Sequence, residues 1–293
     1  MNIIATPAGP LRDNLLLGAL PDDSWERLRP NLHPVWLPAR RAIYEGGAKV
    51  THVYFPSTVL VSSLGVMSDG GSAAIALTGY EGMVGVALLL GSNSMPNWAV
   101  VQSAGWAYRI RSALIQKEFG RNGDFLQLLL RYVQARIIEV TQTALCNRHH
   151  TLDQHLCRWL LQSLDRVETN ELSMTQDLIA TMLGVRREGV TEAAGNLQRA
   201  GLLQYQRGRI TVQNRAGLAA RCCECYEVVR KEFNRLLRTP QRMSGKVRCA
   251  TVAYSVHING SRYSEPREHR AAPPHLIAHK LPARMVTSPT ELD

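Results

Sequence analysis

The chain has 293 residues, of which 45% are hydrophobic and 20% are charged, and its formal net charge at pH 7 is +10. This length and composition allow one or two globular domains with buried cores, and they exclude a protein that is disordered or fibrous throughout. The positive charge favours a polyanionic partner, with nucleic acid ahead of an anionic membrane.

Residues 1–10 contain neither a charged segment nor a long apolar stretch, so the sequence shows no secretory signal. The longest apolar runs, such as residues 84–90, are too short to span a bilayer. We therefore expect a cytoplasmic protein with no membrane partner. Scattered cysteines favour reduced thiols over a disulfide framework. They are Cys146, Cys157, Cys222, Cys223, Cys225 and Cys249.

Residues 12–123 are rich in glycine and proline and contain short apolar runs, which predict a compact domain built mainly from strands. One or two short helices are expected before the strands, in residues 14–29, with a break at Pro21. The expected strands are residues 52–55, 58–64, 73–77, 83–90 and 99–104.

Residues 124–146 carry an apolar repeat with alternating spacings of four and three, which is the a/d seam of a coiled coil. The repeat consists of Leu126, Leu130, Val133, Ile137, Val140 and Ala144. It predicts a dimerisation helix. The alternative is an ordinary amphipathic helix buried within one chain, and the regularity of the seam favours the dimer.

Residues 151–237 predict a second, mainly helical domain with a strand pair near residues 203–212. Thr175 is a suitable N-cap for a helix that ends at Leu183, and Gly184 suits the turn that follows. A second helix is expected from Arg186 to Arg199, followed by a basic β-hairpin. This order predicts a winged helix-turn-helix, with a plain helical hairpin as the alternative. Residues 240–293 are rich in proline and histidine, and we expect a mostly disordered basic tail with one apolar run at 252–258.

Several short segments resemble the Crp/Fnr family of bacterial transcription regulators. They are residues 184–191 (GVRREGVT), 197–202 (LQRAGL), 208–210 (GRI), 44–46, 53–56 and 81–85. The resemblance covers about residues 12–235 and implies an α+β fold. Its parts are an N-terminal β-roll, which is a cyclic-nucleotide-binding-like jelly roll, a long dimerisation helix and a C-terminal winged helix-turn-helix.

The resemblance implies a homodimer that binds palindromic double-stranded DNA, with RNA polymerase as a further partner. It places Arg187 and Glu188 on the bases, where arginine can pair with guanine and glutamate can accept a hydrogen bond from cytosine. Other expected DNA-binding residues are Thr175, Gln176, Arg186, Thr191, Glu192, Arg207 and Arg209. Family members often have serine at position 186 and arginine at 192, so the preferred DNA sequence stays open.

The β-roll lacks two residues that hold cyclic nucleotides in the family. Val86 stands at the position of the ribose-binding glutamate, and Asn97 or a neighbour stands at that of the phosphate-binding arginine. A buried phosphate without a cation is unfavourable by several kcal/mol. We expect no cyclic nucleotide bound in the usual way, and the effector is unknown. Residues 1–145 contain no cysteine, which argues against the iron–sulfur cluster of the Fnr branch.

Two clusters contain residue types that can bind a metal. Cys222, Cys223 and Cys225 lack the second ligand pair of a structural zinc site, and on one helix their thiols would diverge, so small apolar packing residues are favoured. A polar hinge is the favoured interpretation of the second cluster, which is Cys146, His149, His150 and His155. We therefore predict no metal and no cofactor.

Two other classes of function are alternatives to the regulator. No common catalytic motif is found, so an enzyme is not expected. A winged helix that binds protein instead of DNA is the second alternative. It would need an apolar outer face where Arg186, Arg187 and Arg209 stand.

Overall fold

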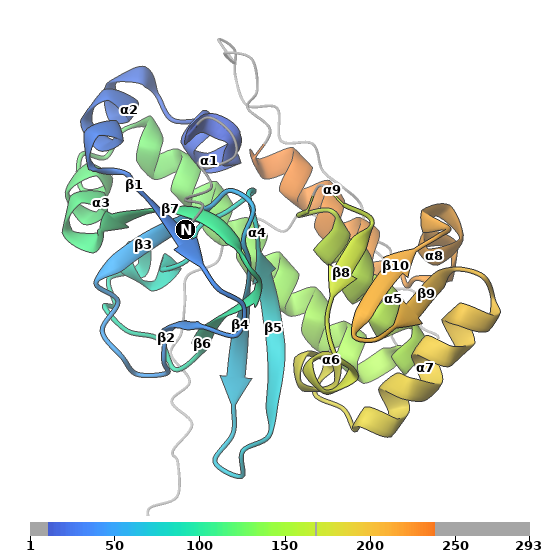
Figure 1. Cartoon of the computed structure of the whole chain (residues 1–293). Helices are drawn as coiled ribbons and strands as arrows, with labels where there is room; N and C mark the ends of the chain where they lie inside the picture. The colour runs from blue at the N-terminus through green and yellow to red at the C-terminus, as the bar shows by residue number, and fades with distance from the viewer. Residues whose placement is uncertain (1–10, 168, 238–293) are drawn as a thin grey trace, which may run out of the picture. The chain divides into compact units, whose positions relative to one another are not determined.

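The computed structural model describes residues 11–167 and 169–237, so the expected tail at 240–293, with its apolar run, lies outside the described residues. Figure 1 shows the arrangement of the elements. The N-terminal part contains η1 (Leu11–Asp13), α1 (Leu15–Gly18), α2 (Asp22–Leu28), η2 (Arg29–Asn31), β1 (His33–Leu37), β2 (Ala42–Tyr44), β3 (His52–Pro56), β4 (Leu60–Val66), β5 (Ser72–Thr78), η3 (Val86–Leu90), β6 (Trp98–Ser103), β7 (Gly105–Arg111) and α3 (Ser112–Phe119).

The C-terminal part begins with the longest described helix, α4 (Asp124–His149). After it come α5 (Leu152–Leu164), β8 (Glu171–Ser173), α6 (Gln176–Leu183), α7 (Arg187–Arg199), β9 (Leu203–Gln206), β10 (Arg209–Val212), α8 (Arg215–Arg221) and α9 (Cys225–Leu237). In the part of the chain that the structure describes, no helix is both long and apolar enough to cross a membrane.

The strands of the N-terminal part form two antiparallel sheets, with the orders β1-β7-β3 and β2-β6-β4-β5. Alternate residues point inward, as Val53 and Phe55 do on β3, because successive side chains of a strand lie on opposite faces. These sheets and the helical C-terminal part confirm the expected α+β class. The split of residues 14–29 into two short helices at Pro21 is also confirmed.

The expected strand at residues 83–90 is wrong. Its second half forms the 3₁₀ helix η3, whose flanking Gly85 and Gly91 have φ angles of 109° and 84°. Glycine adopts this left-handed conformation without a Cβ clash, and the chain turns at both positions. Leu88 and Leu89 then point into the core from a helical turn, which an apolar run of this length does not distinguish from a strand.

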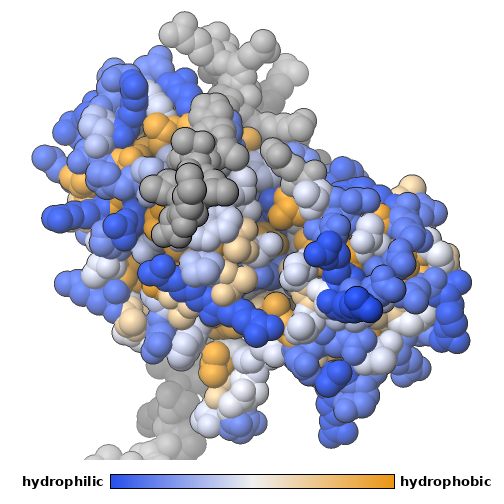
Figure 2. All heavy atoms as spheres, viewed as in Figure 1, coloured by the Kyte–Doolittle hydropathy of each residue, from blue (hydrophilic) through white to orange (hydrophobic). Residues whose placement is uncertain are grey.

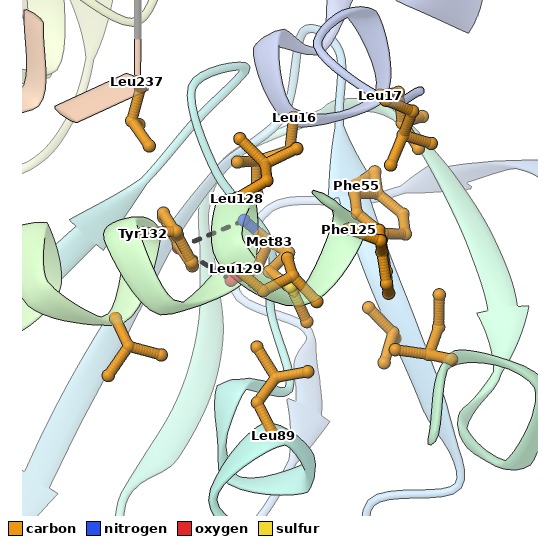
Figure 3. Packing of buried hydrophobic residues seen from close by; sticks show 14 of the residues in the cluster. Leu16, Leu17, Phe55, Met83, Leu89, Phe125, Leu128, Leu129, Tyr132 and Leu237 are labelled. Carbon is orange, nitrogen blue, oxygen red and sulfur yellow. Dashed lines mark hydrogen bonds between the residues drawn. The ribbon is translucent and has the colours of Figure 1, made fainter. Parts of the chain in front are cut away.

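The first half of α4 packs its inner face on the β-roll and on α1 (Figure 3). Phe125 and Leu129 are buried there among Leu16 and Phe55. The Tyr132 hydroxyl donates a hydrogen bond to the Met83 carbonyl oxygen at 3.0 Å and accepts one from the Met83 N–H at 3.1 Å. These contacts fix the start of α4 to the β-roll.

The second half of α4 makes ionic contacts. Arg166, which follows α5, lies with its Nε 2.7 Å from Glu81 Oε1 and its Nη2 3.5 Å from Glu139 Oε1. Arg136 Nη1 lies 2.6 Å from the other Glu139 oxygen. The side chains of Arg166, Glu81 and Glu139 are at least 89% buried. This network of four charges joins the β-roll, α4 and the segment that leads to the helix-turn-helix.

The C-terminal part forms a core between α5, α6, α7 and a three-stranded sheet of order β8-β10-β9, and Leu60, Leu64 and Leu77 of β4 and β5 also belong to this core. The strand β8 was not expected from the sequence, because three residues are too few to show a periodicity. The last described helix, α9, packs along α4 and adds Val229, Phe233 and Leu236 to the apolar core that α4 shares with the β-roll (Figure 1).

Candidate DNA-binding surface

The helix-turn-helix consists of α6 and α7. The Thr175 hydroxyl caps α6 by accepting a hydrogen bond from the Leu178 N–H at 3.3 Å. Gly184 ends this helix with a φ of 65°, the left-handed conformation that the sequence predicts for the turn. Helix α7 buries Val190 and Leu197, which fixes the direction of its opposite face.

That opposite face carries the predicted DNA-binding residues of α7, and all of them are exposed. They are Arg186, Arg187, Glu188, Thr191 and Glu192. Two contacts connect them to the first turn of α6. Arg187 Nε lies 3.5 Å from Asp177 Oδ1, and the Thr191 hydroxyl donates a hydrogen bond to Gln176 Oε1 at 2.9 Å. The structure therefore brings Gln176, Arg187 and Thr191 together at the surface.

The wing is the hairpin of β9 and β10. Its two-residue loop, Arg207 and Gly208, has φ angles of 50° and 77°, as in the type I′ turns that join antiparallel strands. Arg207 is exposed at the tip. Arg209, at the start of β10, places its Nε 2.7 Å from Glu171 Oε1 on β8, and about two thirds of its side chain is exposed.

The arrangement suits contact with a polyanion. The N-terminus of α7 presents backbone N–H groups, since Arg186 at its N-cap makes no side-chain cap hydrogen bond, and helix N-termini favour phosphate. On the face seen in Figure 2, hydrophilic residues cover most of the surface around α7 and the wing. The same surface also carries carboxylates, since Glu188 and Glu192 are exposed on α7, four residues apart.

A second feature is a pocket of about 270 Å³ between the β-roll and α4, lined mainly by apolar side chains. Val86 and Asn97, the two positions weighed for cyclic-nucleotide binding, both line it. Among the described residues that line it, Arg136 is the one guanidinium, and it already binds Glu139 and the Leu77 carbonyl oxygen. The pocket therefore offers apolar contacts and no uncommitted arginine or lysine.

A third feature is the outer stripe of α4. Leu130, Ile137 and Val140 of the predicted seam are 44%, 61% and 41% exposed, and Ala144 is exposed as well. Leu126 is half-buried. Val133, by contrast, is only 9% exposed and packs in the core of its own chain. The seam residues thus divide between an exposed apolar stripe and the intrachain core.

The expectation that one helix carries Cys222, Cys223 and Cys225 is wrong. Helix α8 ends at Arg221 and α9 begins at Cys225, so the chain bends between them. The bend brings Cys223 Sγ to 3.6 Å from Cys146 Sγ, in the last turns of α4. Cys146 and Cys223 are 77 residues apart, and no local pattern in the sequence indicates that their thiols meet.

The thiols interact with one another. The pKa of Cys223 is lowered, because the Cys146 and Cys222 thiols hydrogen bond to its sulfur. The same hydrogen bonds, together with burial, raise the pKa of Cys146 and that of Cys222. Burial raises the pKa of Cys225 to about 11. These hydrogen bonds therefore favour the thiolate form of Cys223 over that of its neighbours.

Comparison with known proteins gives one family match in sequence and many matches in fold. Residues 154–221 match the model of the Crp-like helix-turn-helix domain. No curated protein matches the chain. The structure of FixK2 from Bradyrhizobium japonicum is similar, with 19% identity and a TM-score of 0.58, over 66% of this chain and 98% of FixK2.

Two further structures show the same fold. The c-di-GMP responsive global regulator CLP from Xanthomonas campestris has 16% identity and a TM-score of 0.53, over 66% of this chain and 99% of CLP. A transcriptional regulator of the CRP family from Thermus thermophilus has 16% identity and a TM-score of 0.54, over 64% of this chain and 95% of its own.

These matches confirm the resemblance to the Crp/Fnr family. The chain has the fold of a Crp/Fnr-type transcription regulator, with a cyclic-nucleotide-binding-like β-roll, a long helix and a Crp-like helix-turn-helix at residues 154–221.

Proposed function

We propose that the protein is a homodimeric transcription regulator that recognises a specific DNA sequence through α7. The observation that carries this proposal is the exposed face of α7, where Arg187 and Glu188 stand at the start of a helix whose other face is buried. An arginine there can bind guanine O6 and N7 together, and a glutamate can accept from cytosine N4. Arg187 is the residue that we assign to a guanine.

Other residues on this surface position the protein on the phosphates. Thr175 and Gln176 lie at the start of α6, Arg186 at the start of α7, and Arg207 and Arg209 on the wing. Contacts of this kind orient a protein on the duplex without selecting a sequence. In the proposed complex, Thr191 and Glu192, one turn further along α7, contact the groove of DNA in which Arg187 reaches the bases.

The exposed apolar stripe of α4 supports a dimer. An apolar stripe with a/d spacing on a long helix is stabilised when a second copy of the helix covers it. In the proposed interface, Leu130, Ile137, Val140 and Ala144 contact the partner directly, and Leu126 contacts it at the edge. Val133 is buried in its own chain and supports the interface residues without contacting the partner directly.

We propose that cyclic AMP is not the effector. The pocket has Val86 and Asn97 at the two positions considered, and Arg136 would have to leave Glu139 to bind a phosphate. Calorimetric titration with cyclic AMP should give no binding heat, and a micromolar dissociation constant would refute this part of the proposal. The effector is unknown, and the proposed place of action is the cytoplasm, with RNA polymerase as a partner.

One observation favours a protein-binding winged helix as the second candidate. The four arginines of the surface (Arg186, Arg187, Arg207 and Arg209) are accompanied by four carboxylates (Glu171, Asp177, Glu188 and Glu192), so their formal charges cancel. A surface without net charge attracts DNA less strongly at long range.

Selection from a pool of randomised duplex DNA tests the proposal against this candidate. A dimer with one α7 per subunit should select a palindrome whose half-sites are centred about one helical turn apart, roughly 34 Å. Selection of no sequence at physiological salt would reject the regulator in favour of the protein-binding module.

A further inference from the structure

Four metal-ligating side chains converge where α4 ends and the bend between α8 and α9 begins. They are Cys146, His150, Cys223 and Cys225, and their ligand atoms all lie within 4.8 Å of one another. Cys146 lies in the last turn of α4, and His150 is the C-cap that follows it, with its N–H bonded to the Cys146 carbonyl oxygen at 3.0 Å. Cys223 and Cys225 come from the bend, with one residue between them.

The spacing of the ligand atoms fits one small ion. Cys146 Sγ lies 3.6 Å from Cys223 Sγ, and Cys225 Sγ lies 3.6 Å from His150 Nδ1. In a zinc tetrahedron with Zn–S bonds of about 2.3 Å, neighbouring sulfur atoms are about 3.8 Å apart. A disulfide would require about 2.05 Å between two sulfur atoms, so the thiols are placed around a shared centre and are not bonded in pairs.

The surroundings of His150 are those of a metal ligand. Its Nδ1 faces the sulfur atoms, and its Nε2 lies 3.4 Å from Glu224 Oε2. A metal-bound imidazole commonly donates its second N–H to a carboxylate, which fixes the ring and its tautomer. Glu224 is the residue between the two cysteines of the bend, so the same short segment supplies two ligands and the carboxylate.

We propose that Cys146, His150, Cys223 and Cys225 bind one zinc ion. Three thiolates and one imidazole form a soft, tetrahedral donor set, which zinc favours over magnesium, calcium or manganese. The protein supplies all four ligands and leaves no position for water or substrate, so the ion is structural. The sulfur atoms of Cys146, Cys223 and Cys225 are buried, which protects the bound ion from exchange.

The zinc ion ties the end of the proposed dimerisation helix to the bend between α8 and α9, and α8 connects this bend to the wing. Among the described residues, the bend also contacts the end of α4 through the pair of His150 and Glu224, and α9, which follows the bend, packs along α4. Binding releases the protons of the neutral thiols and favours the bent arrangement over an extended one. The ion thereby holds the helix-turn-helix at a defined place relative to α4.

The test uses the full-length chain, purified under reducing conditions and loaded with equimolar zinc. After weakly bound metal is removed by gel filtration, elemental analysis should find one zinc ion per chain. Cobalt added in place of zinc should show the strong visible bands of a tetrahedral site and the ultraviolet bands of thiolate ligands.

Matched variants identify the ligands. His150→Ala and Cys225→Ala should lower the affinity for zinc at least a hundredfold, whereas the neighbours His149→Ala and Cys222→Ala should retain the ion. His150 is a suitable position for substitution because it is the C-cap of α4 and lies at the edge of the cluster. The variant His150→Cys should again bind cobalt in a tetrahedral site, with an additional thiolate band. A chelator should lower the melting temperature of the unmodified protein but not that of His150→Ala.

Three results would overturn the proposal. They are no zinc uptake by the unmodified chain, full retention of zinc by both His150→Ala and Cys225→Ala, or a disulfide between two of the three cysteines in protein purified separately without reductant. Zinc content is measured without DNA, so failure of this proposal and failure of DNA recognition are separate outcomes.

Discussion

The surface of α7 and the pocket of the β-roll differ in the charged groups that they leave available. Arg186 and Arg207 are exposed on the helix-turn-helix, and Arg187 and Arg209 make only surface ion pairs. In the pocket, Arg136 is held by a buried carboxylate and a carbonyl oxygen. Surface pairs exchange readily for a phosphate, because each contributes at most about 1 kcal/mol, whereas a buried pair does not.

The difference indicates that the charged groups at the surface of α7 and those in the pocket of the β-roll can differ independently within the same fold. The groups that suit DNA are present at one end, while those that hold an anionic nucleotide are absent at the other among the described residues. The buried charges around Arg166 connect the β-roll with the segment that leads to the helix-turn-helix. The largest effects are expected for variants of this network and of the outer stripe of α4.

The largest effect is expected for Arg166→Ala. The substitution removes the guanidinium that pairs with Glu81 and one of the two guanidinium groups that pair with Glu139. Both carboxylates are buried. Breaking a buried ion pair from one side costs about 3–5 kcal/mol. The free energy of unfolding, measured by urea titration, should fall by that amount. Arg215→Ala, which removes an exposed pair with Asp165, should cost less than about 1 kcal/mol. Equal effects would contradict the role of the buried network.

Next in size is Ile137→Glu on the exposed stripe of α4. In a dimer the change removes two buried side chains and places two carboxylates at the seam, so the dimer dissociation constant should rise about a hundredfold or more. Analytical ultracentrifugation measures it. Ile137→Leu should remain dimeric, and so should Gln116→Glu, which adds the same charge on α3. Val133→Glu is a poorer test, because Val133 also packs in its own chain. A monomeric unmodified protein at micromolar concentration would exclude the dimer.

A smaller effect is expected for Arg209→Ala on the wing. If Arg209 contacts a phosphate, the variant should weaken binding to all sequences alike and lower the slope of log affinity against log salt by about one per subunit. Glu171→Gln is the matched opposite, since it frees Arg209 from its ion pair and should raise affinity a few-fold. Fluorescence anisotropy at several salt concentrations would measure both, and an unchanged slope would remove Arg209 from the contact surface.

The helix-turn-helix could be predicted from the sequence almost residue by residue because its signals are local. Thr175 caps α6, Gly184 permits a left-handed turn, and Gly208 permits the tight wing loop. The β-roll was predicted less completely. The edge strand β1 begins with a histidine and a proline, the edge strand β2 has only three residues, and β7 has arginines on its outer face, so neither alternation nor a long apolar run marks them.

Contacts between distant segments could not be predicted. Glu81 and Arg166 are 85 residues apart, and Cys146 and Cys223 are 77 apart. Each looks like an ordinary residue within its own segment, and only the packing of α5 and α9 against α4 brings them together. The seam of α4 shows the same limit, because its spacing predicts an apolar stripe but not that Val133 turns toward its own core.

The central claim is that α7 recognises a DNA sequence, and Arg187→Ala tests it most directly. Selection from a randomised pool should give the same half-site as the unmodified protein with the preference lost at one base pair. Affinity for the original site should fall by about 1–3 kcal/mol, or roughly 5- to 150-fold. Arg199→Ala, an exposed arginine at the other end of α7, should leave the selected sequence unchanged. An unchanged sequence with Arg187→Ala would contradict the account.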